Sequence, residues 1–287
     1  MRILGQLLVS SRPLSWINTA FPFGAAYLLT TGRLDAAFWV GTVFFLIPYN
    51  LAMYGINDVF DYASDLRNPR KGGVEGALLD PRVHRTTLIA AVVTCLPFLA
   101  VLVVLGDPLS WLVLAISMVA VVAYSAKGLR FKEKPFLDSL TSSTHFVSPA
   151  VYGLVLAGAT FTPALWLILA AFFLWGVASH AFGAVQDIVA DCAGGLASIA
   201  TVIGGRWTVR FSFACYVLAG LLLLGTEWPG PLAAILALPY AASILPWWSV
   251  RDEDAESANR GWRRFLGLNF VTGFLVALLL IWFLTLG

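Results

Sequence analysis

The chain has 287 residues, of which 59% are hydrophobic and only 12% charged, and its mean hydropathy is +0.83. Soluble globular chains are about 25% charged, so this composition excludes a water-soluble protein, and the high hydrophobicity excludes an intrinsically disordered one. The net charge of +2 is too small to indicate nucleic-acid binding. The cysteines lie far apart in the sequence and predict neither a disulfide framework nor a zinc site.

The apolar residues are grouped into long continuous runs. A membrane-spanning helix needs about 20 mostly apolar residues, whereas the strands of a membrane β-barrel would alternate apolar and polar residues. The runs therefore predict an all-α integral membrane protein that forms a single domain over residues 1–287. Nine spans are expected, at residues 14–31, 37–56, 86–106, 108–126, 139–159, 163–185, 209–226, 229–249 and 265–286.

The basic residues fall almost entirely on one side of these predicted spans. Of the 18 Lys and Arg residues, only Arg33 lies in a connection on the opposite side, so 17 of 18 share one face. Lys and Arg are enriched in the cytoplasmic loops of membrane proteins. We therefore expect a cell-membrane protein with its N-terminus in the cytoplasm and its C-terminus outside.

Two acidic segments lie at the cytoplasmic ends of the second and sixth predicted spans. The first reads N-D-x-x-D-x-x-x-D and the second Q-D-x-x-x-D. On a helix that turns by about 100° per residue, the polar residues of each segment share one face. The candidate metal-binding and catalytic residues are Asn57, Asp58, Asp61, Asp65, Asp187 and Asp191.

Clustered carboxylates repel one another unless a cation neutralises them. Hard oxygen ligands without His or Cys favour Mg²⁺, which often bridges carboxylates to substrate phosphates. One acidic pair with i,i+4 spacing would be read as an ordinary solvated helix end. Two such segments at the same membrane face favour a functional site, because acidic residues at a membrane boundary are usually functional.

Basic residues follow the acidic segment and the fourth predicted span, and Arg and Lys bind phosphate oxygens. For these residues, orientation of the protein in the membrane is the alternative explanation of the charge. Together the residues predict a substrate with a diphosphate head and a hydrocarbon body. The candidate substrate-binding residues in these segments are Arg67, Lys71, Tyr124, Lys127, Arg130 and Lys132.

The two acidic motifs and the predicted spans resemble the UbiA superfamily of intramembrane prenyltransferases over essentially the whole chain. The loop segments at residues 11–20, 54–62, 68–73 and 132–136 are similar to those of its lycopene elongase subgroup. The resemblance implies a UbiA-like fold of nine transmembrane helices around a central cavity, with Mg²⁺ at the six acidic-motif positions. Many relatives have Lys four residues after the tyrosine that follows span four. Gly128 stands there in this chain.

The resemblance also implies a reaction, in which Mg²⁺ and basic residues assist departure of diphosphate from dimethylallyl diphosphate. The C5 group would be added to the end of lycopene, giving C45 and C50 carotenoids, with proton loss and hydration both open as the final step. Asn18 and His180 are expected to line the substrate cavity, with His180 a candidate base.

Other functions remain open at this point. An aromatic or quinone-precursor acceptor is the alternative within the same chemistry, and a transporter is a distant one. The lipid bilayer and a carotenoid cyclase are the candidate partners.

Overall fold

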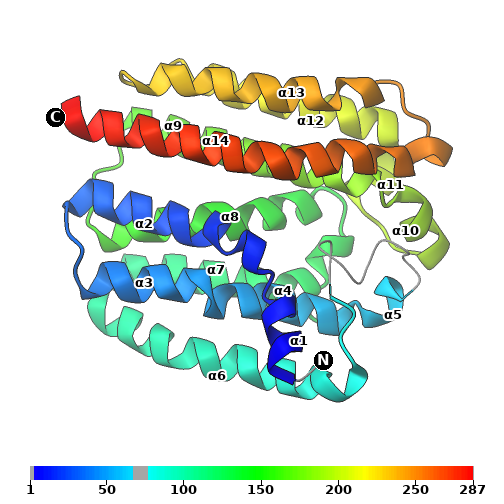
Figure 1. Ribbon diagram of the computed structural model, residues 1–287, viewed down its shortest axis with the longest axis horizontal. Coiled ribbons are helices and arrows are strands. Elements are labelled where there is room, and N and C mark those ends of the chain that lie inside the picture. Colours follow the sequence, from blue (N-terminus) through cyan, green and yellow to red (C-terminus); the bar gives the residue numbers. More distant parts are fainter. Residues whose placement is uncertain (1–2, 67–76, 287) are drawn as a thin grey trace. The chain divides into compact units, whose positions relative to one another are not determined.

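A computed structural model describes residues 3–66 and 77–286. Within these residues the chain is helical and contains no β-strand (Figure 1). The helices form two compact units, one made of Met1–Phe131 and Thr144–Ala159, the other of Lys132–Ser143 and Thr160–Gly287. The predicted all-α class is therefore confirmed.

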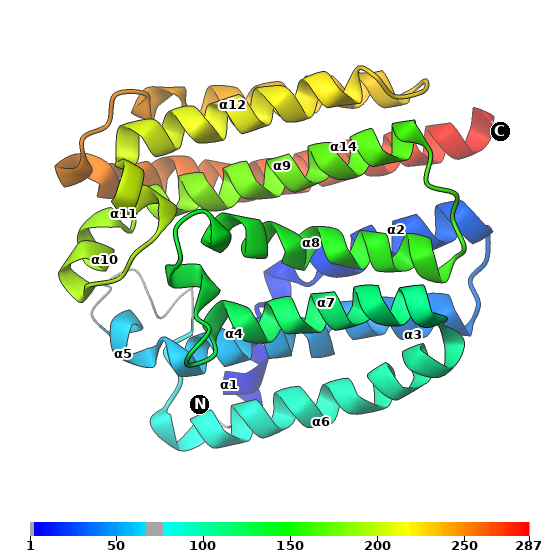
Figure 2. The same cartoon turned by 180° about the vertical axis from the view of Figure 1, so that it is seen from behind.

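The first unit packs its long helices around α4. In Figures 1 and 2, α3 and α4 follow one another along α6, and α7 also contacts α4. The short α1 packs across α4 and α6 near the N-terminus. The elements of this unit are α1 (Ile3–Ser10), η1 (Pro13–Ser15), α2 (Ile17–Thr31), α3 (Ala36–Leu46), α4 (Pro48–Phe60), α5 (Tyr62–Asp65), α6 (Pro81–Leu105), α7 (Pro108–Ser125) and most of α8 (Leu137–Leu156).

The helix break between α3 and α4 is stabilised by a buried amide. Pro48 cannot donate a backbone hydrogen bond, so it interrupts the helix. The Asn50 side chain donates to the Phe45 carbonyl at 2.8 Å and to Thr19 Oγ1 at 2.7 Å. Such side-chain bonds satisfy backbone groups that water cannot reach in a membrane. The two helices therefore continue as one apolar segment, Ala36–Phe60, which carries the first acidic motif at its end.

The second unit is built on the pairing of α9 with α12, which run beside one another in Figure 2. Its core combines small and branched aliphatic residues with the aromatic side chains of Phe182, Tyr216, Tyr240, Trp247 and Phe265. Its elements are η2 (Phe131–Glu133), the first part of α8, α9 (Pro163–Val185), α10 (Ile188–Gly194), α11 (Ile199–Ile203), α12 (Gly205–Leu223), η3 (Gly230–Leu236), α13 (Ala237–Ile244), η4 (Leu245–Trp247), η5 (Asp252–Ala258) and α14 (Asn259–Leu286).

Seven helical segments in the described chain are long and apolar enough to cross a membrane. The count of nine predicted from the sequence is not reached, for two different reasons. The first predicted span is α2, which has only 15 residues. The fifth is α8, which has 20 residues but begins with a polar stretch that includes Asp138 and His145, and this stretch lowers its hydropathy.

The close approach of α2 and α3 depends on a glycine. A Cβ atom built on Gly41 would lie 2.0 Å from the Phe23 ring. Phe23 is fully buried and also contacts the rings of Phe45 and Tyr152. This ring has no open space into which it could move.

We predict that Gly41→Ala destabilises the protein by about 1–3 kcal/mol, because overpacking forces the Phe23 ring to shift. Thermal unfolding in detergent measures the effect. Gly273→Ala is the matched control, since nothing lies within 4 Å of a Cβ there and alanine favours the helix. Equal stability of the Gly41→Ala variant and the wild type would contradict this packing.

Candidate functional site

The first acidic motif continues the helical path beyond α4. The Asp61 amide donates to the Asn57 carbonyl at 2.9 Å, and the Asp65 amide donates to the Asp61 carbonyl at 2.8 Å. The short α5 therefore keeps the i,i+4 spacing across the junction. Asn57, Asp61 and Asp65 follow one another along one helical face, as the sequence predicted.

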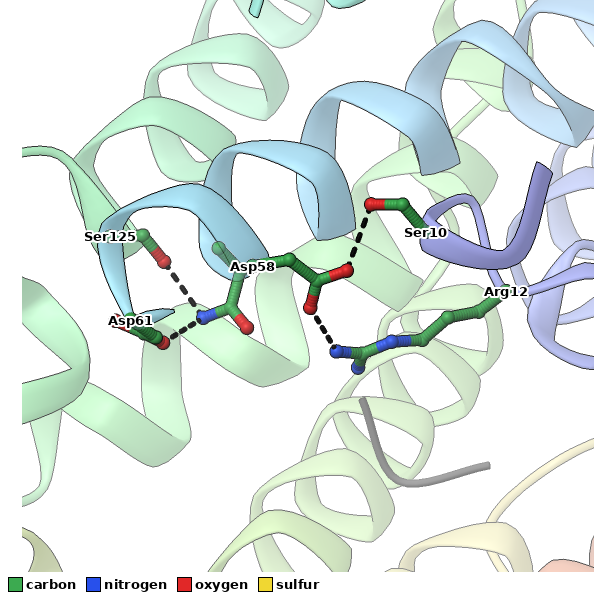
Figure 3. A network of polar contacts seen from close by, with 6 residues as sticks. Ser10, Arg12, Asp58, Asp61 and Ser125 are labelled. Atoms are coloured by element: carbon green, nitrogen blue, oxygen red, sulfur yellow. Dashed lines mark hydrogen bonds and ion pairs between the residues drawn. The ribbon is translucent and has the colours of Figure 1, made fainter. Parts of the chain in front are cut away.

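Asn57 and Asp61 form a hydrogen-bonded pair. The Asn57 amide nitrogen donates to Asp61 Oδ2 at 2.7 Å and to Ser125 Oγ at 3.0 Å, at the last residue of α7 (Figure 3). Arg130 lies beside them, with Nη2 3.6 Å from Asp61 Oδ1. Because the amide nitrogen of Asn57 makes both hydrogen bonds, its amide oxygen is the atom that can bind an external cation.

Asp58 lies on a different side of α4. Its Oδ1 accepts a hydrogen bond from Arg12 Nη2 at 2.9 Å, and its Oδ2 accepts one from Ser10 Oγ at 2.8 Å (Figure 3). The expectation that all four polar residues share one face is therefore wrong for Asp58. Its partners lie at the end of α1 and in the turn that follows, whereas those of Asn57 are Asp61 and the end of α7.

The carboxylates of this motif are nearly inaccessible to water. Asp58, Asp61 and Asp65 are 0%, 5% and 6% exposed. Burying a charge is costly unless a partner compensates it, and two arginines provide part of the compensation. Arg12 and Arg130 both have left-handed backbones, with φ of 51° and 41°. This conformation is unfavourable for residues other than glycine, and such strain is often found at functional sites.

The remaining predicted residues of the first unit are placed as follows. Tyr124 packs edge-on against the His145 ring, with centroids 5.2 Å apart. Lys127 is exposed after the end of α7, and Asn18 is half-buried in the first turn of α2. Arg67 and Lys71 lie outside the described residues. Arg130 contacts the acidic motif through Asp61.

The second acidic motif lies in the second unit, at the junction of α9 and α10. The Asp191 amide donates to the Asp187 carbonyl at 2.8 Å, which keeps the two half-buried carboxylates one helical turn apart. The preceding Gln186 is buried, and its Oε1 accepts a hydrogen bond from Asn259 Nδ2 at 2.6 Å. This bond ties the start of α14 to the motif. Lys132 also belongs to this unit, half-buried in η2.

His180 belongs to a polar chain that sequence reasoning missed. Its Nδ1 lies 3.0 Å from Ser139 Oγ, which in turn donates to Asp138 Oδ1 at 3.2 Å. Asp138 is fully buried, and its Oδ2 accepts the Ile199 amide at the start of α11 at 2.7 Å. The chain thus links the His180 ring, through the Ser139 hydroxyl, to a buried carboxylate.

The chemistry of the donor set fits a magnesium ion better than a softer metal. The two motifs offer carboxylate and amide oxygens, which are the ligands that Mg²⁺ prefers. Within the described residues, no three His, Cys, Asp or Glu side chains are grouped closely enough to form a complete metal site by themselves. Mg²⁺ in proteins commonly keeps water ligands and binds substrate phosphates in addition to one or two carboxylates.

Comparison with known proteins places this chain in a defined class. The profile of the UbiA prenyltransferase family matches residues 19–271. The chain belongs to this family and is a membrane-embedded prenyltransferase.

The curated relatives are more specific. The chain is 53% identical to a protein of Corynebacterium glutamicum named lycopene elongase/hydratase, over 98% of both chains. It is 57% identical over 98% of its length to the C(50) beta-cyclic carotenoids biosynthesis protein LbtBC of Dietzia sp., of which it spans 65%.

Solved structures share the fold at low sequence identity. A UbiA homolog from Archaeoglobus fulgidus bound to DMAPP and Mg²⁺ superimposes with a TM-score of 0.70 and 19% identity, covering 93% of this chain and 98% of that one. A UbiA homolog from Aeropyrum pernix K1 gives a TM-score of 0.58 at 20% identity, covering 96% and 99%. The predicted UbiA-like fold is therefore confirmed.

Proposed function

We propose that this protein transfers a dimethylallyl group from its diphosphate to the end of lycopene, giving C45 and C50 carotenoids. The observation that carries this proposal is the 53% identity, over 98% of both chains, to a protein named lycopene elongase/hydratase. The two acidic motifs support it, since they offer carboxylate and amide oxygens of the kind that Mg²⁺ prefers.

The proposed metal ligands are Asn57, Asp61, Asp65, Asp187 and Asp191. Bound Mg²⁺ would offset the negative charge that develops on the diphosphate as it leaves. Arg130 is already held beside Asp61 and supplies a further positive charge. Among the basic residues after α7, it is therefore our first candidate for a contact with the diphosphate, and Lys127 and Lys132 are the others.

In the proposed reaction the C–O bond of dimethylallyl diphosphate breaks and leaves an allylic cation. The terminal double bond of lycopene attacks this cation, and a C–C bond forms. The resulting tertiary cation either loses a proton, which creates a new double bond, or captures water and then loses a proton. The imidazole of His180 is the proposed proton acceptor, because its hydrogen bond to Ser139 holds the ring in place.

We further propose that α2 and α8 also cross the membrane, which gives nine spans with the N-terminus in the cytoplasm. The distribution of basic residues supports this arrangement, since 17 of 18 then lie on one side.

Expression of this chain in a lycopene-accumulating host tests the function. We predict carotenoids that are heavier than lycopene by one or two C5 units, with or without added water, as measured by mass spectrometry. The Asp187→Asn variant expressed to the same level is the control. If the wild-type protein is in the membrane but lycopene is unchanged, the acceptor is wrong, and a prenylated aromatic product would support the alternative acceptor.

The metal ligands are tested by single substitutions. We predict that Asp61→Asn and Asp187→Asn each lower turnover by roughly 100-fold or more, because Asn keeps the shape but removes the charge that binds Mg²⁺. Unfolding temperatures should stay close to that of the wild type. The matched control is Asp107→Asn, because Asp107 caps the N-terminus of α7 and Asn caps helices equally well. Full activity of either test variant would refute its role as a ligand.

The orientation is tested with a native cysteine. Cys192 is exposed in α10, one residue from Asp191, whereas Cys95 and Cys215 are buried. We predict that a membrane-impermeant maleimide labels Cys192 in inside-out vesicles but not in intact cells. In a Cys192→Ser background, Glu227→Cys should be labelled from outside instead. The reverse pattern would contradict the proposed orientation.

A further inference from the structure

We propose that Asp58 is a positioning residue that fixes the last turn of α4, and that it is not a magnesium ligand. This inference rests on the proposed function for its catalytic consequence, though not for its structural one. It separates Asp58 from the other acidic residues of the motif, with which the sequence groups it.

Both oxygens of the Asp58 carboxylate are already used by donors of the protein. Arg12 Nη2 and Ser10 Oγ lie 2.9 Å and 2.8 Å from them, and these two contacts are the complete set for Asp58 within the described residues. The carboxylate is fully buried. A metal ion at Asp58 would have to displace a guanidinium and a hydroxyl and leave both groups unsatisfied in a place that water does not reach.

Arg12 is held by the same helix that carries Asp58. Its guanidinium carbon lies 4.2 Å from the centre of the Tyr54 ring, and Tyr54 precedes Asp58 by one helical turn. The ring and the carboxylate therefore form a cradle on one face of α4. The left-handed backbone of Arg12, with φ of 51°, turns the side chain into this cradle, and its Nε is buried without a hydrogen-bond partner among the described residues.

The cradle sets the rotation of α4 about its own axis. With Asp58 held by Ser10 and Arg12, the adjacent Asn57 is turned by about 100° around the helix and bonds to Ser125 and Asp61. Loss of the bonds from Ser10 and Arg12 to Asp58 would let the last turn of α4 rotate. The hydrogen-bonded pair of Asn57 and Asp61, whose oxygens are proposed to bind the metal, would then be less well positioned. Asp58 thus acts through the helix, while Asn57 and Asp61 act on the ion.

Titration of the purified full-length protein with MgCl₂ alone, followed by thermal unfolding in detergent, tests this assignment. We expect Asp58→Asn to lower the unfolding temperature without metal by roughly 5–10 °C, because a buried ion pair loses one partner. Its half-saturating Mg²⁺ concentration should stay within about threefold of the wild type. Asp61→Asn should instead raise that concentration by about tenfold or more.

The Arg12→Gln/Asp58→Asn double variant distinguishes a coupled pair from an independent ligand. We expect it to be no less stable than Asp58→Asn alone, because removal of both charges leaves no unpaired ion. If Asp58→Asn does not fold, the double variant takes its place in the titration. A tenfold increase of the half-saturating Mg²⁺ concentration in either variant would show that Asp58 binds the metal and would overturn the proposal.

Turnover separates positioning from stability alone. At saturating Mg²⁺ and at a temperature where all variants are folded, we expect Arg12→Gln and Asp58→Asn to lower kcat by about tenfold, and Arg12→Lys to restore most of it. An unchanged kcat in both variants would show that Arg12 and Asp58 affect stability alone, and it would contradict the proposal. A wild-type protein that binds Mg²⁺ as described but does not elongate lycopene would refute the proposed function and leave the assignment of Asp58 intact.

Discussion

The structure of this protein depends on how it compensates the charge of carboxylates that are buried near the ends of apolar helices. Asp58, Asp61, Asp65 and Asp138 are all nearly inaccessible to water, and removing one partner of a buried charge pair costs about 3–5 kcal/mol. The chain compensates these charges in different ways. Asp58 receives a guanidinium and a hydroxyl, Asp138 receives backbone and serine donors, and Asp61 receives the Asn57 amide and the more distant Arg130.

The difference between these environments assigns different roles to chemically identical residues. Asp58 and Asp138 make the direct, short contacts that hold elements together, from α1 to α4 and from α8 to α11. Asp61 is paired with an amide and lies 3.6 Å from a partly exposed arginine. Asp61, which we propose as a magnesium ligand, accepts a hydrogen bond from the Asn57 amide, whereas Asp58 forms a 2.9 Å ion pair with Arg12.

The rest of the first unit supports the position of this charge. Pro48 interrupts the long apolar segment, and Asn50 satisfies the carbonyls at the break. The close packing of Phe23 over Gly41 fixes α2 against α3. The same buried cluster includes Tyr49 of α4, the helix that carries Asn57 and ends directly before Asp61.

The sequence predicted the parts of the site that depend on local periodicity. The i,i+4 spacing placed Asn57 next to Asp61 and Asp187 next to Asp191, because helical geometry alone determines these neighbours. It could not predict the partner of Asp58, since Arg12 is 46 residues away and only tertiary packing brings it there. Asp138 was missed for the same reason, because the amide bound to its Oδ2 belongs to Ile199 at the start of α11, 61 residues away.

The span count shows the limit of hydropathy. The runs at α6 and α9 are long and strongly apolar, and the sequence located them well. The polar first half of α8 makes its own hydrogen bonds, including that of Ser143 to the Phe173 carbonyl. These internal bonds let a helix of low hydropathy pack inside the protein, and no composition threshold can detect them.

The most direct test of this account is a coupled assay with the purified protein in liposomes that contain lycopene. Labelled dimethylallyl diphosphate is added with and without Mg²⁺, and release of inorganic diphosphate is measured alongside label in the carotenoid fraction. The account predicts that diphosphate release requires Mg²⁺ and lycopene together and equals the number of C5 groups added. Diphosphate release at the same rate without lycopene, with no label in the carotenoids, would contradict it.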